Sequence, residues 1–319
     1  MNTEIEAKNL VIEAGHRLLE KKLVARTWGN ISARINQSEF VITPSGREYD
    51  TLTHNDLVVV DVHDCSYTGD IKPSSEKGIH ASVYRYREDV NFIIHTHQFF
   101  ASAVAADGMD TQFAPCAEYA LPGTKRLRRN VERCLKNNIE TDAILMKSHG
   151  AILMGDDEDA TFDSAELLEE KCAQLVKNRI PDVDAVTKIN IDLKALNTDY
   201  RYVKVQRDPY IDECCTAGLR LRPYVDDFAQ IVGFDVKCCV PDISKIEKAV
   251  KGRNAVLVKG VGAICFADTK SDVDAVAMIT SKNCAAACYA RHAKPLGKLD
   301  AILQRYVYLN KYSKEKDAY

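Results

Sequence analysis

Two histidines, His95 and His97, flank Thr96 at the polar end of a segment whose apolar start predicts a strand. Because side chains alternate between the two faces of a strand, both imidazoles must point to the same side. His149 follows a second predicted strand, and Glu76 lies near the start of a predicted helix. Zinc in proteins takes about three or four nitrogen, sulfur or oxygen donors. The three histidines and the carboxylate are therefore candidate metal ligands, although each histidine taken alone is more often an ordinary core or surface residue.

The segment Lys72-Pro73-Ser74-Ser75-Glu76 places two hydroxyl groups at the predicted start of that helix. Exposed N–H groups and the helix dipole favour an anion there, and phosphate is the natural ligand. The alternative is a simple N-cap by one of the serines, with the glutamate favourable in the first turn. Gly29-Asn30 and Ser45-Gly46 are turn motifs when taken singly. Together with the two serines, they could supply donors for one phosphate.

Hydrophobic periodicity predicts the elements that must position these groups. Helices are expected over residues 5–23, 76–86 and 156–178. Strands are expected over residues 28–34, 39–43, 56–62, 91–97 and 141–146, and the polar residues between the first two are typical of a hairpin. The candidate ligands thus lie at the ends of elements, where binding sites tend to be built.

The C-terminal part of the chain contains a partial repeat. Residues 255–264 resemble residues 143–152, with Ala, Leu, Lys, Gly, Ala and Ile matching at one constant offset. Both copies continue into an Asp-rich turn and an Ala-rich helix, and Val261 stands where the first copy has His149. Chance similarity is the alternative, because buried strands use few residue types. The prediction is an internal duplication whose second copy lost this histidine.

The composition is that of an ordinary globular protein, with 46% hydrophobic and 28% charged residues among 319. A chain of this length favours two domains of about 150 residues each. The formal charge of -3 argues against nucleic acid as a partner. No segment approaches the roughly 20 apolar residues that span a bilayer, and the N-terminal residues lack the apolar core of a secretory signal. We therefore expect no membrane partner and a cytoplasmic location.

Taken in order, these motifs resemble the class II aldolase/adducin family over roughly residues 5–180. The specificity comes from the order of the motifs. The matching residues are Gly29-Asn30-Ile31-Ser32, Ile42-Thr43-Pro44-Ser45-Gly46, Lys72-Pro73-Ser74-Ser75-Glu76 with His80, His95-Thr96-His97, Tyr119 with Gly123-Thr124, and His149-Gly150.

The resemblance implies an α/β fold in which three layers, helix, sheet and helix, surround a largely antiparallel sheet over residues 1–180. After a linker of about residues 181–204, residues 205–319 would form a smaller, degenerate repeat of the same fold without metal ligands. The family commonly assembles as a cyclic tetramer, so we expect a homo-oligomer. One hypothesis is that the second copy packs where a neighbouring subunit's surface would sit.

The resemblance also implies roles for individual residues. His95, His97 and His149 would hold a zinc ion, although another divalent transition metal could bind in the same geometry. Glu76 would be a metal ligand in the resting state and the acid/base during turnover. The residues that would clamp the substrate phosphate are Asn30, Ser45, Gly46, Ser74 and Ser75.

These roles imply a zinc-dependent aldolase, a lyase of carbohydrate metabolism. It would cleave a ketose 1-phosphate, such as a fuculose-, rhamnulose- or ribulose-type sugar phosphate, to dihydroxyacetone phosphate and an aldehyde. The alternatives on the same scaffold are a sugar-phosphate 4-epimerase, a dehydratase or a decarboxylase, and a different class is a non-catalytic, adducin-like assembly module. A glutamate rather than an aspartate at position 76 favours aldol chemistry, and the presence of all four ligands argues against the non-catalytic class.

One departure from the family pattern concerns the stretch between His97 and His149, which is shorter than in a member enzyme. The missing part, before Cys116-Ala117-Glu118-Tyr119, is where that enzyme carries an active-site tyrosine. No residue here clearly replaces it. The group that protonates the departing aldehyde oxygen therefore stays open.

Overall fold

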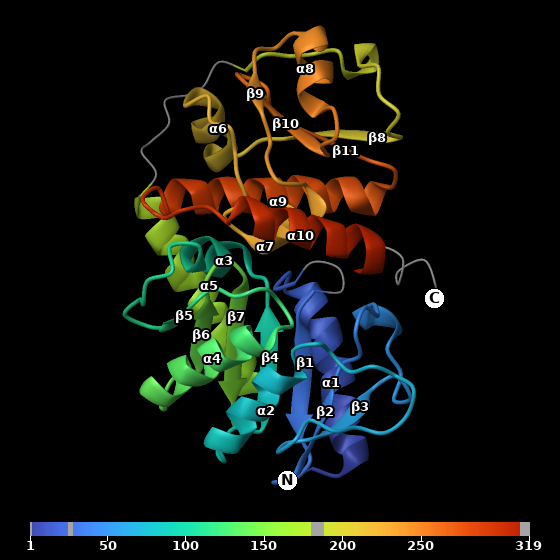
Figure 1. The fold of residues 1–319 in the computed structure, drawn as a ribbon, viewed down its shortest axis with the longest axis vertical. Coiled ribbons are helices and arrows are strands. Elements are labelled where there is room, and N and C mark those ends of the chain that lie inside the picture. Colours follow the sequence, from blue (N-terminus) through green and yellow to red (C-terminus); the bar gives the residue numbers. More distant parts are fainter. Residues whose placement is uncertain (1, 25–27, 180–187, 313–319) are drawn as a thin grey trace. The chain divides into compact units, whose positions relative to one another are not determined.

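The computed structural model describes residues 2–24, 28–179 and 188–312, which form two compact units that divide between Cys172 and Ala173. Unit 1 contains a seven-stranded sheet and unit 2 a four-stranded sheet (Figure 1). Within the described ranges, no helix is long and apolar enough to cross a membrane.

The sheet of unit 1 has the strand order β3-β2-β1-β4-β7-β6-β5. Neighbouring strands are antiparallel, except that β5 runs parallel to β6. The strands are β1 (Asn30–Arg34), β2 (Glu39–Ile42), β3 (Val58–Asp61), β4 (Phe92–Thr96), β5 (Cys116–Ala117), β6 (Ala143–Met146) and β7 (Gly150–Gly155). The largely antiparallel sheet expected from the family resemblance is confirmed.

Helices cover both faces of this sheet. The helices α2 and α4 share one hydrophobic core with the strands, in which Ile79 and Leu127 pack with Ile93. On the other face, α1 contacts β1 and β2, and α3 contacts β6 and β7. The helical segments of unit 1 are α1 (Glu4–Glu20), the short 3-10 turn η1 (Tyr49–Thr51), α2 (Lys77–Tyr86), α3 (Phe99–Ala105), α4 (Lys125–Asn137) and α5 (Glu158–Asn178), whose end lies beyond the unit boundary.

The sequence pattern explains where these elements begin and end. Thr3 and Glu6 form a capping box that starts α1, whose buried residues follow the helical period. The predicted hairpin is confirmed by the antiparallel pairing of β1 with β2. The predicted strand over residues 91–97 ends at Thr96, so His97 lies just beyond it. The prediction did not include α3, α4 or β7. Short apolar runs of this kind do not distinguish a buried strand from a buried helix by their periodicity alone.

Unit 2 has the strand order β8-β11-β10-β9, in which only β9 and β10 are parallel. Its strands are β8 (Tyr202–Gln206), β9 (Cys238–Cys239), β10 (Ala255–Val258) and β11 (Gly262–Ala267). Its helical segments are the 3-10 turn η2 (Leu193–Ala195), α6 (Pro209–Thr216), α7 (Asp226–Ile231), α8 (Ile243–Val250), α9 (Lys270–Tyr289), α10 (Lys298–Val307) and the π-helical turn η3 (Tyr308–Tyr312).

The two sheets share local features that are compatible with the predicted repeat. In unit 1, Met146 pairs with Gly150 across β6 and β7, and in unit 2, Val258 pairs with Gly262 across β10 and β11. The turns between them contain Ser148 (φ 58°) and Gly260 (φ 75°), both left-handed. In unit 1, β6 also pairs in parallel with β5, and in unit 2, β10 also pairs in parallel with β9. The origin of unit 2 by duplication stays a prediction.

The two predicted domains span residues 1–180 and 205–319. Residues 181–187 of the predicted linker lie outside the described residues. Leu196, within the remaining linker, belongs to the hydrophobic core of unit 2 together with Val256 and Ile264. These boundaries stay predictions.

Candidate metal centre

His95 lies near the end of β4, the central strand of unit 1, which is flanked by β1 and β7. Asn30 is its partner on β1, and Ile152 is its partner on β7. His95 lies on the same face of β4 as Ile93, which packs with Ile79 of α2. His97 lies just beyond the strand end, with its ring centroid 4.7 Å from that of His95. The centre of the sheet thus fixes the backbone of the first histidine from both sides.

Two glycines let the flanking chains approach this strand end. A Cβ atom at Gly29, which has φ +87°, would lie 2.3 Å from the carbonyl oxygen of His95. A Cβ atom at Gly150 would lie 2.2 Å from the carbonyl oxygen of Thr96. Real Cβ atoms do not come this close to a backbone oxygen, so both positions require glycine.

His149 is carried by the tight turn between β6 and β7. Ser148 in this turn has a left-handed backbone (φ 58°), and the His149 N–H donates to the Met146 carbonyl at 3.0 Å. The turn stacks the His149 ring on His95, with the ring centroids 4.8 Å apart and the planes 23° apart. The third histidine is therefore brought to the first two by a short connection rather than by a long loop.

The three imidazoles form one buried cluster. One nitrogen from each of His95, His97 and His149 lies within 4.8 Å of the others. The Nε2 atoms of His95 and His97 are 3.1 Å apart. Glu76 completes the cluster, because its Oε2 atom is 3.3 Å from His95 Nε2 and its Oε1 atom is 3.2 Å from His149 Nε2. The four residues predicted to be ligands therefore do lie together.

The protonation of the cluster suits a cation. The Ala151 carbonyl can only accept, so the His95 Nδ1 atom, at 2.9 Å, must be the donor, and the Nε2 lone pair points at the cluster. Burial lowers the pKa of His95 to about 3, so this imidazole is neutral near pH 7. Burial alone would raise the pKa of Glu76, but the surrounding imidazoles and the Asn30 amide hold it well below its usual value. A neutral imidazole beside an ionised carboxylate is the state that binds metal.

The spacing of the donors also fits a metal ion. Metal–nitrogen and metal–oxygen bonds of about 2.0–2.2 Å in a tetrahedron place neighbouring ligand atoms about 3.3 Å apart. The three separations from His95 to His97, His95 to Glu76 and His149 to Glu76 are 3.1, 3.3 and 3.2 Å. The ring of Trp28, 5.9 Å from that of His97, lies beside the cluster.

Glu76 is placed by the turn that starts α2. It occupies the N-cap position of this helix without making a side-chain cap, and its N–H donates to the Ser74 Oγ atom at 3.2 Å. Its side chain is therefore free of capping and turns back to the histidines. The alternative that a serine is the N-cap residue is therefore wrong, because Glu76 occupies that position. Ser74 accepts only the N–H of Glu76 itself.

The segments predicted to clamp a phosphate are neighbours. Pro44 and Pro73 form an isolated antiparallel bridge, with Ser45 N–H donating to Lys72 O at 3.0 Å. Ser45 and Gly46 are half-buried, Ser74 is buried and Ser75 is exposed. Asn30 differs from the prediction in its contacts, because its Nδ2 atom donates to Glu76 at 3.1 Å. Their role toward a phosphate stays a prediction.

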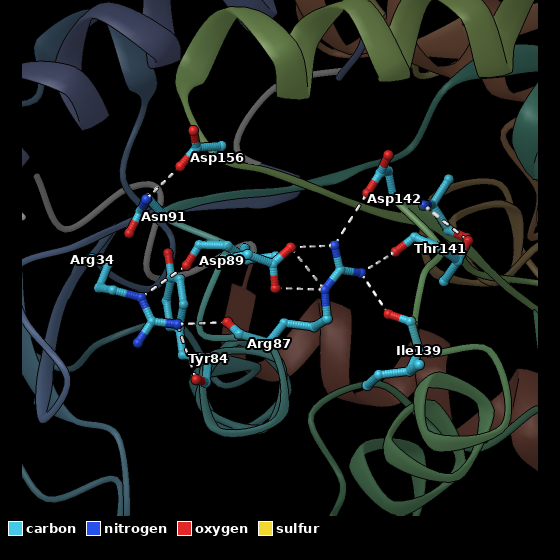
Figure 2. A network of polar contacts seen from close by, with 11 residues as sticks. Arg34, Tyr84, Arg87, Asp89, Asn91, Ile139, Thr141, Asp142 and Asp156 are labelled. Atoms are coloured by element: carbon cyan, nitrogen blue, oxygen red, sulfur yellow. Dashed lines mark hydrogen bonds and ion pairs between the residues drawn. The ribbon is translucent and has the colours of Figure 1, made fainter.

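Sequence reasoning gave no role to the buried polar residues behind the cluster. Figure 2 shows Arg34 on β1, whose Nη2 atom donates to the carbonyls of Tyr84 and Arg87 at 2.9 and 2.8 Å. Arg87 in turn binds Asp89 and the carbonyls of residues 139 and 141. These bonds tie β1 to the end of α2. The sequence does contain a pattern that could have indicated them, because polar residues occupy every second position of β1, a strand that is buried on both faces.

Comparisons with known proteins agree with this geometry. The sequence matches the family described as Class II Aldolase and Adducin N-terminal domain over residues 9–176. The L-fuculose phosphate aldolase of Methanococcus maripaludis (strain C7) is 32% identical over 170 residues, which cover 50% of this chain and 90% of that protein. A Mycoplasma pneumoniae protein named "Probable L-ribulose-5-phosphate 4-epimerase" is 30% identical over 194 residues, 53% of this chain and 80% of its own.

A solved structure supports the fold. The YgbL protein of Klebsiella pneumoniae superimposes with a TM-score of 0.50 and 21% identity, covering 58% of this chain and 95% of its own.

Proposed function

This chain belongs to the class II aldolase and adducin family, and from that premise we propose that it is a metal-dependent aldolase that cleaves a ketose 1-phosphate. The products would be dihydroxyacetone phosphate and an aldehyde. The observation that carries the proposal is the buried set of three imidazoles and Glu76, whose spacing fits one divalent cation. Its relatives named as sugar-phosphate aldolases and epimerases support the substrate class.

In this proposal His95, His97 and His149 hold the metal, and zinc is the preferred ion for such a set. When bound, the ion supplies Lewis-acid polarisation of the substrate carbonyl and hydroxyl oxygens. Glu76 moves the proton, because its carboxylate is in contact with two of the imidazoles. Its pKa would rise once substrate displaced it from these partners, since burial would then act alone.

The neighbouring turns would bind the phosphate of the substrate. Ser45, Gly46, Ser74 and Ser75 lie on two segments joined by the Pro44–Pro73 bridge, and Asn30 lies beside Glu76. Backbone N–H groups and hydroxyls at the start of α2 suit an anion. Their contribution would be orientation of the reacting carbons near Glu76.

The second candidate is a sugar-phosphate 4-epimerase, favoured by the similarity to the Mycoplasma protein. The same cluster could serve a dehydratase or a decarboxylase. A non-catalytic assembly module is disfavoured by the complete ligand set. We also propose a homo-oligomer and a cytoplasmic location, as expected from the family resemblance and the sequence.

The test is retro-aldol cleavage by the zinc-loaded chain over a panel of ketose 1-phosphates, following release of dihydroxyacetone phosphate. We expect Glu76→Gln to lower kcat about 100-fold or more, because a positioned acid/base contributes about 10²–10⁴-fold. The matched control is Glu140→Gln, at an exposed position, which should retain full activity. Absence of cleavage with every substrate, at one bound metal per chain, would overturn the aldolase proposal and favour epimerase chemistry.

A further inference from the structure

Two rows of polar residues meet behind the metal centre. Asn30 and Ser32 lie on the same face of β1, since they are two residues apart on a strand. His80 and Tyr84 lie four residues apart on α2 and so share one face of the helix. All four side chains are buried, with exposed fractions between 0% and 4%. Polar groups buried this deeply must satisfy one another.

Short contacts link these side chains into one chain of hydrogen bonds, which we call the polar chain (Tyr84, Ser32, His80, Asn30 and Glu76). The Tyr84 hydroxyl is 2.8 Å from Ser32 Oγ, which is 2.7 Å from His80 Nδ1. His80 Nε2 is 2.5 Å from Asn30 Oδ1. Asn30 Nδ2 is 3.1 Å from Glu76 Oε2. The polar chain therefore runs from the interior of the unit to the metal centre.

The orientation of the Asn30 amide fixes the direction of every bond. Its Nδ2–H group, which only donates, faces Glu76 Oε2, and its Oδ1 atom faces His80 Nε2. An amide oxygen only accepts, so His80 must carry its proton on Nε2 and, as a neutral imidazole, leave Nδ1 bare. The Ser32 hydroxyl must then donate to Nδ1, and the Tyr84 hydroxyl must donate to Ser32.

We propose that His80 is a positioning residue, which as the neutral Nε2–H tautomer holds the Asn30 amide with its Nδ2–H group toward the metal centre. With Oδ1 engaged by His80, Asn30 can only donate into the site. It therefore favours negatively charged partners, which here are the Glu76 carboxylate and, under the proposed function, an anionic group of the substrate. The tautomer follows from the geometry alone, whereas the kinetic consequence rests on the proposed function.

The far end of the polar chain is anchored by the network in Figure 2. The guanidinium group of Arg34 lies 4.5 Å from the ring centroid of Tyr84, and its Nη2 atom donates to the Tyr84 carbonyl at 2.9 Å. Burial raises the pKa of the Tyr84 phenol, which keeps it a donor. Burial also lowers the pKa of His80 to about 3, which keeps its imidazole neutral. Tyr84 and His80 thus each have a single protonation state near pH 7.

The direct test is a long-range ¹H–¹⁵N spectrum of histidine-labelled full-length protein at pH 7, with the His80 signals assigned by their loss in His80→Gln. We expect a protonated Nε2 and an unprotonated Nδ1. A protonated Nδ1, or an imidazolium ion, would overturn the proposal. This measurement needs no substrate, so its failure is separate from failure of the proposed function.

The kinetic test compares His80→Phe with His80→Gln in the metal-loaded enzyme. Phenylalanine removes both ring nitrogens, and we expect kcat to fall about 10- to 100-fold with a smaller change in KM, as for other groups that orient a metal site. Glutamine can donate to Asn30 and accept from Ser32, so it should restore most of kcat. The matched control is His54→Phe, because exposed His54 makes the same kind of contact, 2.7 Å from Asn9 Oδ1.

The outcomes separate the two proposals. A wild-type enzyme without aldolase activity would count against the proposed function and leave the tautomer result standing. The expected tautomer together with an unchanged kcat in folded His80→Phe would overturn the positioning role. Should His80→Phe fail to fold, the wild-type spectrum, with its His80 signals assigned through His80→Gln, still tests the tautomer, and a protonated Nδ1 would still overturn the proposal.

Discussion

At the scale of residues, burial and charge together determine the state of the site. His95 and His80 are both fully buried, and their pKa values are lowered to about 3 chiefly by desolvation. Glu76 keeps its charge because it has imidazole and amide partners. The site thus combines the neutral imidazole of His95 with one ionised carboxylate, which is the form that a divalent cation requires.

The lowered pKa of His80 makes stability depend on pH. Its folded pKa lies below the value of about 6.5 in the unfolded chain, so the unfolded state binds more protons between pH 6.5 and pH 3. In metal-free protein, the free energy of unfolding of the wild type should therefore fall relative to His80→Gln by about 1.4 kcal/mol per pH unit below pH 6.5. Urea denaturation at several pH values measures this difference. A difference that stays constant from pH 7 to pH 5 would contradict it.

At the scale of elements, the site depends on how closely β1 and β7 approach β4. Gly150 has a normal strand conformation but no room for a side chain, because a Cβ atom would lie 2.2 Å from Thr96 O and 3.1 Å from the His95 ring. Gly262 in unit 2 makes the corresponding close approach to β8, where its Cβ atom would lie 2.5 Å from Gln206 O. The close approach therefore occurs in both sheets, between β7 and β4 in unit 1 and between β11 and β8 in unit 2. In unit 1 the candidate ligands also lie at this strand end.

We expect Gly150→Ala to lower the free energy of unfolding by about 3 kcal/mol, because backbone must move to relieve the overlap. The matched control is Gly69→Ala, where the backbone is left-handed (φ +90°) but no atom lies within 4 Å of the added Cβ. That variant should lose only about 1 kcal/mol, from backbone strain. Chemical denaturation of both variants measures the losses, and equal losses would show that the close approach does not matter.

The sequence was sufficient to predict the hairpin β1–β2 and the strand with His95, because period-2 patterns are local signals. The sequence also offered His149 and Glu76 as candidates at element ends, but the family resemblance supplied their grouping with His95 and His97. The sequence was insufficient for the polar chain. Ser32 and Tyr84 become partners only when β1 packs on α2, a contact between residues 52 positions apart. Tertiary packing of this kind leaves no mark in a local pattern.

At the scale of the whole molecule, two sheets have separate hydrophobic cores. Unit 1 contains the complete ligand cluster, and in unit 2 Val261 occupies the position that corresponds to His149 in the predicted repeat. The strand pairing of β10 with β11 has the same register as that of β6 with β7. The shared register is compatible with the predicted repeat, in which the second copy would lack the metal ligand His149.

The hypothesis that the second copy takes the place of a neighbouring subunit makes a prediction about assembly. A chain that ends after Asn178 should differ from the full chain in oligomeric state or solubility, because it lacks the surface that the second copy would supply. Sedimentation velocity of both chains at equal concentration measures this. A truncated chain that stays soluble, binds metal and assembles as the full chain does would contradict the hypothesis.

The central claim is that His95, His97, His149 and Glu76 form one metal centre, and the most direct test is titration of the metal-free chain with Co²⁺ followed by visible absorption. We predict one ion per chain with a tetrahedral spectrum, loss of binding in His97→Ala, and an altered spectrum in Glu76→Gln. The control His16→Ala, at an exposed position in α1, should bind as the wild type does. Absence of stoichiometric binding, or binding that survives in His97→Ala with an unchanged spectrum, would contradict the account.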